Sequence, residues 1–238
     1  MTARRRVGFL SRWLLVLGLI AVAALPLPPG RTQDVETDLA LVLAVDCSFS
    51  VDAREFRLQM EGLGRAFLRE EIKKAIAQGK HQRIAVAVVQ WSDENNQKVV
   101  LPWTIVSGAA DADELGMILS RLPRQLAEGG TSISTALRFS ALQFERAPAA
   151  ERRVIDISSD GRNNIGPPVQ ATRDNLVARG ITINGLPILN EWPTLDAYFE
   201  KNVVGGPGNF VMPANDYGAY VDAIYAKLLR EITGPGIV

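Results

Sequence analysis

The stretch Asp38–Ser50, DLALVLAVDCSFS, decides how the rest of the chain is arranged. Leu39–Val45 is an unbroken apolar run, and Asp46, Ser48 and Ser50 follow it directly. A short apolar run bounded by polar residues predicts a strand buried on both faces, as in the middle of a parallel sheet. Such sheets bind ligands in the crevice beyond the carboxyl ends of their strands. The sequence therefore places one carboxylate and two hydroxyl groups where this class of fold keeps its binding sites.

These three polar side chains are all hard oxygen ligands. Their spacing of two residues lets them point to the same side of an extended segment. Hard oxygens suit magnesium, manganese or calcium better than metals that prefer thiolate or imidazole. We therefore expect a divalent cation, with magnesium as the first choice. Taken alone, Asp46 could instead cap the following loop, and Ser48 and Ser50 could be turn residues.

The N-terminal residues have the three parts of a secretory signal peptide. Four arginines come first, Trp13–Leu25 is apolar and uncharged, and Ala21–Ala23 (AVA) is a small-residue cleavage pattern. The apolar run is shorter than the roughly 20 residues that a membrane-spanning helix needs. We predict a signal peptide at 1–24, a linker at 25–37 and a periplasmic or secreted product. Retention of the segment as a membrane anchor is the alternative.

Composition argues against several classes of function. Without residues 1–24 the chain keeps 22 Lys+Arg against 26 Asp+Glu, a formal net charge of −4, and no basic stripe for nucleic acid. Cys47 is the single cysteine, and we expect it to be buried and to face away from the cation. His81, the single histidine, precedes the predicted strand Arg83–Trp91 and so lies at the opposite end of the sheet from Ser48. No Ser-His-Asp triad can form, although a metal-dependent phosphoryl-transfer or hydrolytic enzyme remains an alternative.

Strand-like and helix-like segments alternate along the rest of the chain. Further strands are predicted at Arg83–Trp91, Lys98–Trp103, Arg153–Ser158, Ile181–Leu186 and Asn209–Met212. Helices are predicted at Asp52–Gly79, Asp111–Leu122, Ile133–Arg146, Pro168–Arg179, Thr194–Lys201 and Asp216–Ile232. The short connection before Lys98 implies a hairpin with one antiparallel edge strand. The pattern predicts an α/β fold at 38–233, a doubly wound and mostly parallel sheet with helices on both faces, followed by a flexible tail at 234–238.

Two further loops carry oxygen ligands. Thr131 lies in the glycine-rich loop Glu128–Ser132, and Asp160 comes directly before Gly161. Each has a simpler explanation when taken alone, because Thr131 could be a helix N-cap and Asp160-Gly161 a turn.

Together with Asp46, Ser48 and Ser50, these loops resemble the metal-ion-dependent adhesion site (MIDAS) of the von Willebrand factor type A (vWA) domain. All five positions match the family pattern in the right order, and the resemblance covers roughly Asp38 to Ile232. The chain is also similar to an uncharacterised family of secreted bacterial vWA-like domains.

The resemblance implies a ligand set and a function. Ser48, Ser50 and Thr131 would offer hydroxyl oxygens to the metal, and Asp46 and Asp160 would reach it largely through water. Mostly neutral ligands would leave the cation much of its positive charge, so that a carboxylate of a partner protein could fill an open coordination position. The implied protein is an extracytoplasmic binding module and not an enzyme, and we expect a monomer. A vWA scaffold with a non-functional metal site is the other alternative.

Several neighbouring residues are expected to support this site. The residues expected to contact the partner are Phe49, Arg162, Asn163 and Asn164. Trp91 is expected to pack, and Asp156 to pair with an arginine or a helix N-terminus. In this family, partner binding can be coupled to a shift of the last helix, which here would be Asp216–Ile232.

Overall fold

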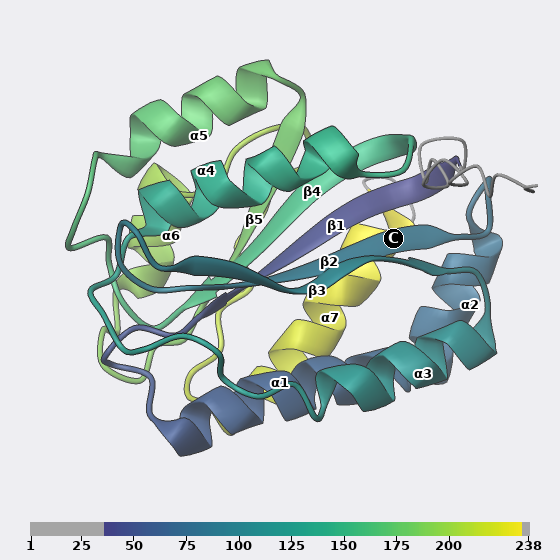
Figure 1. The fold of residues 1–238 in the computed structure, drawn as a ribbon, viewed down its shortest axis with the longest axis horizontal. Coiled ribbons are helices and arrows are strands. Elements are labelled where there is room, and N and C mark those ends of the chain that lie inside the picture. The colour runs from purple at the N-terminus through teal and green to yellow at the C-terminus, as the bar shows by residue number, and fades with distance from the viewer. Residues whose placement is uncertain (1–35, 235–238) are drawn as a thin grey trace, which may run out of the picture. The chain divides into compact units, whose positions relative to one another are not determined.

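The computed structural model describes residues 36–234, so the predicted signal peptide, most of the linker and the tail after Gly234 lie outside it. Five strands form one sheet in the order β3-β2-β1-β4-β5 (Figure 1). They are β1 (Thr37–Asp46), β2 (Ile84–Trp91), β3 (Gln97–Val106), β4 (Ala150–Ser159) and β5 (Ile181–Pro187). All neighbouring strands are parallel except β3, which pairs antiparallel with β2 at the edge. The predicted α/β fold with one antiparallel edge strand is confirmed.

The first strand is the centre of this sheet. Nine of the ten residues of β1 are buried, and the strand pairs with β2 on one side and with β4 on the other. Its apolar run is continuous because both of its faces are covered, which is the usual pattern of parallel sheets. The strand ends at Asp46, so the polar residues that follow lie at the carboxyl edge of the sheet.

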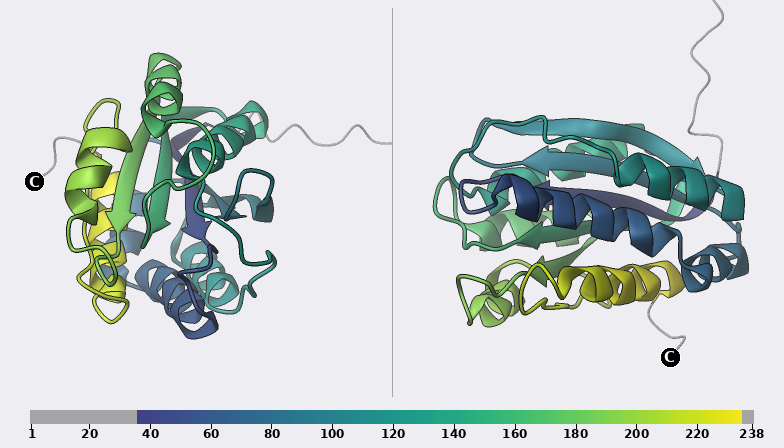
Figure 2. Two further views of the ribbon diagram at one scale, coloured as in Figure 1. Left: turned by 90° about the vertical axis from the view of Figure 1, so that its left-hand side faces the viewer. Right: turned by 90° about the horizontal axis from the view of Figure 1, so that it is seen from below.

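Within residues 36–234, seven α-helices cover the two faces. They are α1 (Ala53–Phe67), α2 (Glu70–Gln78), α3 (Ala109–Leu119), α4 (Ile133–Gln143), α5 (Val169–Ala178), α6 (Leu195–Asn202) and α7 (Tyr220–Thr233). The helices α1, α2, α3 and α7 bury their apolar side chains against one face, and α4, α5 and α6 against the other (Figures 1 and 2). No described helix is both long enough and apolar enough to span a membrane.

The prediction of one helix over Asp52–Gly79 is wrong, because the chain breaks between α1 and α2. The start is as expected: Asp52 and Glu55 form a capping box. Continuing the buried face of α1 beyond Phe67 would bring charged side chains such as Glu71 to the core. The break at Leu68 and Arg69 lets apolar residues of α2 face the core instead.

Two other predictions fail near the C-terminus. The strand predicted at Asn209–Met212 is reduced to isolated bridges, such as the one between Gly185 and Val211. Pro187 and Pro213 lie on the two facing segments, and neither has an N–H to extend a ladder. The last helix begins at Tyr220 and not at Asp216, because Asp216 Oδ1 accepts the N–H of Ala219 at 2.8 Å and closes a turn before the helix.

Candidate metal site

Three loops are in contact at the carboxyl end of the sheet. Loop 1 (Asp46–Val51) follows β1, loop 2 (Glu128–Ser132) precedes α4, and loop 3 (Asp160–Asn164) follows β4. The backbone N–H of Phe49 donates to the carbonyl of Gly129 at 2.9 Å, which ties loop 1 to loop 2. All five predicted metal ligands lie in these three loops.

Four of the predicted ligands form one chain of hydrogen bonds. Oδ1 of Asp46 accepts the backbone N–H of Ser48 at 2.7 Å. The hydroxyl oxygens of Ser48 and Ser50 lie 3.2 Å apart. Ser50 in turn donates to Oδ1 of Asp160 at 2.6 Å. The fold thus brings together oxygens of loops 1 and 3 that are 110 positions apart in the chain.

Thr131, the fifth predicted ligand, is held against loop 3. Its N–H donates to Asn164 Oδ1 at 2.8 Å, and its carbonyl accepts the N–H of Asn164 at 2.9 Å. A β-carbon at Gly161 would lie 3.4 Å from Thr131 Oγ1, so this hydroxyl is next to loop 3. Thr131 Oγ1 accepts a hydrogen bond from Asn164 Nδ2 at 3.5 Å, and no described hydrogen bond joins it to the other four candidates.

The two carboxylates at this site are buried without a positive partner. Asp46 is fully buried and Asp160 is 1% exposed, and neither forms an ion pair with Lys, Arg or His within residues 36–234. Burial and then the charge of Asp160 raise the pKa of Asp46 to about 7, against hydrogen bonds from Ser159 and Ser48. Burial also raises the pKa of Asp160. A buried carboxylate pair of this kind lacks the counter-charge that a divalent cation would supply.

The donor set also fits a hard cation. It consists of two carboxylates and three hydroxyls, which are oxygen ligands of the kind that Mg²⁺ and Ca²⁺ prefer. No group of three or more His, Cys, Asp or Glu side chains that could hold a metal occurs in the described part of the chain. The residues therefore fit a MIDAS-type site with mixed hydroxyl and carboxylate ligands, and they do not resemble a Cys/His zinc site.

Residues that the sequence did not reveal hold these ligands in place. Ser159 donates to the second carboxylate oxygen of Asp46. The buried Gln59 of α1 donates to the backbone carbonyl of Asp46 at 3.5 Å and accepts the hydroxyl of Ser158 at 3.2 Å. Tyr217 donates to Oδ2 of Asp160 at 3.0 Å. A glutamine among the apolar positions of α1 is a sequence signal for such a role.

The residues expected to contact a partner divide into two kinds. Phe49 is 69% exposed, and Arg162 is exposed and stacks 5.3 Å from the ring of Trp192. Asn163 and Asn164 serve the protein itself, because their Oδ1 atoms accept backbone N–H groups of α4 and loop 2. The exposed side chains of Phe49 and Arg162 therefore offer surface to another molecule, with Arg162 also bonded to Thr194 Oγ1 at 2.8 Å. The two asparagines instead hold loops together.

The other expectations near the site have clear outcomes. Trp91 and Cys47 are fully buried in the two cores, as predicted. Asp156 was expected to pair with an arginine or a helix N-terminus, and this is wrong: its Oδ1 lies 2.6 Å from Nζ of Lys227. His81 lies at the end of the sheet opposite the three loops, 2.9 Å from the carboxylate of Glu151 at the start of β4.

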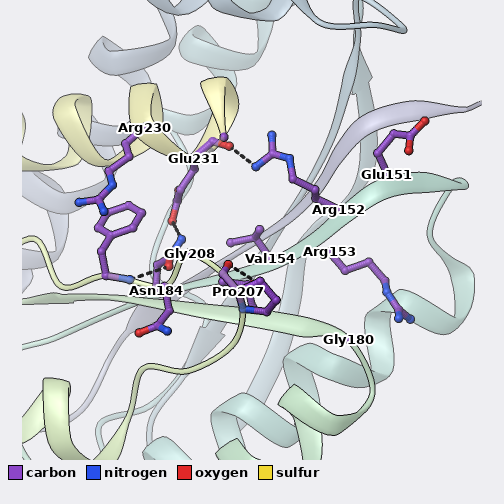
Figure 3. Close-up of a pocket in the computed structure, with 14 residues that line it drawn as sticks. Glu151, Arg152, Arg153, Val154, Gly180, Asn184, Pro207, Gly208, Arg230 and Glu231 are labelled. Carbon is purple, nitrogen blue, oxygen red and sulfur yellow. Dashed lines mark hydrogen bonds between the residues drawn. The ribbon is translucent and has the colours of Figure 1, made fainter. Parts of the chain in front are cut away.

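The end of the sheet opposite the three loops also contains a pocket of about 280 Å³ (Figure 3). It is lined by the first residues of β4 and β5, the segment Pro207–Phe210 and the end of α7. Arg152 donates to the carbonyls of Glu231 and Ile232 at 2.6 and 2.9 Å, and Arg153 donates to the carbonyl of Arg179 at 2.6 Å. These arginines cap the C-terminal ends of α7 and α5, which gives the wall of the pocket a structural role.

Comparisons with known proteins agree with this fold. Residues 36–236 match the family described as "Protein of unknown function (DUF1194)". Proximal thread matrix protein 1 from the mussel byssus, solved with a zinc-occupied MIDAS motif, is 14% identical with a TM-score of 0.58, covering 83% of this chain and 48% of that one. A von Willebrand factor type A structure from Catenulispora acidiphila is 18% identical with a TM-score of 0.56, covering 82% and 43%.

The pilus adhesin SpaC from Lactobacillus rhamnosus GG, in its open conformation, is 14% identical with a TM-score of 0.56, covering 81% of this chain and 30% of that one. This chain thus spans less than half the length of each of these three structures, and at such identities the likeness shows the fold alone. Comparison with curated proteins finds no match. The chain belongs to the DUF1194 family, and its fold is that of a vWA domain.

Proposed function

We propose that the protein is an extracytoplasmic binding module that holds a divalent cation and uses it to bind an acidic side chain of a protein partner. The cation, magnesium first among the candidates, would be held by Asp46, Ser48, Ser50, Thr131 and Asp160. The observation that carries this proposal is the pair of buried carboxylates, which lack any positive partner among the described residues. They are linked through the backbone N–H of Ser48 and the hydroxyls of Ser48 and Ser50. When bound, the cation supplies a positive charge to which an acidic group can bind.

The residues around the site favour a protein-binding function over catalysis. A hydrolase needs a group that takes and returns a proton near the metal. The single histidine, His81, lies at the opposite end of the sheet from the candidate metal site. Among the described residues, no lysine forms an ion pair with Asp46 or Asp160. Large apolar side chains are instead exposed on the segments that follow β1, β4 and β5, namely Phe49, Ile165 and Trp192. Exposed aromatic groups beside a site are typical of surfaces that meet another protein.

Two solved relatives support the proposal by analogy. Proximal thread matrix protein 1 is described with a zinc-occupied MIDAS motif, and SpaC is described as a pilus adhesin. Metal binding in the first and adhesion in the second are properties of those proteins. For this chain we assign the cation to the five residues that match the vWA pattern. We prefer magnesium because these ligands are hydroxyls and carboxylates.

Anomalous diffraction from crystals of the mature protein soaked with Mn²⁺ and acetate tests the ligand set directly. We expect one manganese peak bounded by the hydroxyls of Ser48 and Ser50, with acetate on the side facing solvent. A matched Ser50→Ala crystal should lose most of the peak. A manganese peak elsewhere, or a cation enclosed entirely by protein ligands, would contradict the proposal.

A further inference from the structure

One arginine from a distant segment holds the backbone of loop 1. Arg124 lies between α3 and α4, and its side chain is 15% exposed. Its Nη1 donates to the carbonyl of Val51 at 2.8 Å, and its Nη2 donates to the carbonyls of Cys47 and Ser48. A single guanidinium group therefore binds three carbonyl oxygens of the loop that carries Ser48 and Ser50.

Arg124 is itself fixed by a buried side chain of β2. Gln90 is fully buried, its Nε2 donates to the carbonyl of Pro123 at 2.8 Å, and its Oε1 accepts the N–H of Gln125 at 2.7 Å. These bonds hold the residues on both sides of Arg124. Glu128, at the start of loop 2, lies 3.8 Å from Nη1 of Arg124. The backbone that carries Arg124 is thus anchored to the sheet, independently of loop 1.

We propose that Arg124 is a positioning residue for the cation site, an inference that rests on the proposed function. By binding the carbonyls of Cys47, Ser48 and Val51, the guanidinium keeps them from turning toward the cation and leaves the hydroxyls of loop 1 as its ligands. Two separate nitrogens of one rigid fork reach these carbonyls, Nη1 that of Val51 and Nη2 those of Cys47 and Ser48. The single ammonium nitrogen of a lysine does not reproduce this geometry.

The direction in which metal affinity changes when Arg124 is replaced distinguishes a positioning role from a simple effect of its charge. A guanidinium cation near the site repels a metal cation, so loss of its charge alone would make metal binding tighter. Loss of a positioning group makes metal binding weaker. Arg124→Gln removes both the charge and the fork of donors, and Arg124→Lys keeps the charge and removes the fork.

The test measures binding of Mg²⁺ and Mn²⁺ alone by isothermal titration calorimetry, well below the unfolding temperature of each variant. We expect both Arg124 variants to bind about 10- to 100-fold more weakly, as for other groups that orient metal ligands. Arg121→Gln is the matched control: Arg121 is exposed, three residues away, and its side chain makes no described hydrogen bond or ion pair. Its metal affinity should stay within about twofold of the wild type.

Amide hydrogen exchange in chelator gives a second readout that needs no metal. The N–H groups of Phe49 and Val51 bond to Gly129 and Ser48, and they should exchange faster in both Arg124 variants while the amides at the centre of β1 keep their wild-type rates. Equal or tighter metal binding by Arg124→Gln, beside a wild-type protein that binds metal, overturns the inference and leaves the proposed function standing. A wild-type protein that binds neither metal overturns the proposed function, and with it the role of Arg124 toward a cation.

Discussion

The hydroxyl of Tyr217 donates a hydrogen bond to Oδ2 of Asp160 at 3.0 Å. Tyr217 is 5% exposed and lies three residues before α7, and the other oxygen of Asp160 accepts from Ser50. The carboxylate proposed to face the cation is thus held between loop 1 and the segment that leads into the last helix. The shift of the last helix that the vWA resemblance implies remains a prediction. Through this hydrogen bond, a movement of Asp160 would be transmitted to the segment before α7.

Replacing Tyr217 with phenylalanine should destabilise the metal-free protein. The ring stays in place, but Asp160 Oδ2 loses its donor inside the protein, which costs about 1–3 kcal/mol of the free energy of unfolding. Urea unfolding in chelator measures this loss. Tyr225→Phe is the control, because the Tyr225 ring stacks 4.7 Å from Arg69 and its hydroxyl makes no described hydrogen bond. Equal stability of the two variants would show that the bond to Asp160 contributes nothing.

The side chain of Asn164 should contribute more to stability than that of Arg162. Asn164→Ala leaves the N–H of Thr131 without its acceptor, so we expect a loss of about 1–2 kcal/mol and weaker binding of Mg²⁺. Arg162 is exposed and bonds Thr194 and stacks near Trp192, so Arg162→Ala should cost less, about 0.5–1 kcal/mol. Chemical denaturation of the two variants side by side checks both values. The opposite order would mean that Asn164 belongs to the contact surface.

A buried charge cluster should make stability depend on pH. Nζ of Lys227 lies 2.6 Å from Asp156 and 2.7 Å from Glu231. Arg152, on the same strand as Asp156, donates to the backbone carbonyl of Glu231. Figure 3 shows that Glu231 also meets Asn184, which donates to it at 2.9 Å. Burial, and then the charge of Asp156, raise the pKa of Glu231 to about 7.

Because this pKa is raised above its unfolded value, the folded protein binds more protons than the unfolded chain between about pH 4.5 and pH 7. The free energy of unfolding should therefore fall as the pH rises through this window. Glu231→Gln should flatten the dependence when urea unfolding is measured in chelator at several pH values. The same steep fall in Glu231→Gln would assign the dependence to another group, such as Asp46.

Removing the lysine from this cluster should be more damaging than removing the glutamate. Lys227→Met leaves Asp156 and Glu231 buried without their shared positive partner, and breaking a buried pair in this way costs about 3–5 kcal/mol. Thermal unfolding at neutral pH measures the effect. A loss below about 1 kcal/mol would show that the cluster does not depend on Lys227 for its stability.

The sequence predicts the sheet well because β1 carries a local signal, an apolar run that ends in Asp46. It predicts the candidate ligands because Asp46, Ser48 and Ser50 are close in sequence. The break after Phe67 depends on which side chains reach the core, and the failed strand at Asn209–Met212 depends on the partner residue Pro187. Neither effect is visible in a local pattern.

The supporting residues are hidden for the same reason. Tyr217 is 57 residues from Asp160, and Arg124 is 77 residues from Cys47. Contacts between residues so far apart in sequence follow from the fold, and no local sequence pattern predicts them. Ser159, beside Asp160, could have been suspected from its place at the end of a strand.

The central claim is tested most directly by the stability of the mature protein with and without metal. A ligand that binds only the folded state raises the free energy of unfolding by about 2.7 kcal/mol when its free concentration is a hundredfold above Kd. We expect millimolar Mg²⁺ or Mn²⁺, added after chelator, to raise the unfolding temperature of the wild type. The rise should disappear in Asp46→Asn and Asp160→Asn and persist in Asp174→Asn, an exposed control on α5. No rise in the wild type, or an equal rise in all three variants, would contradict a cation site at Asp46 and Asp160.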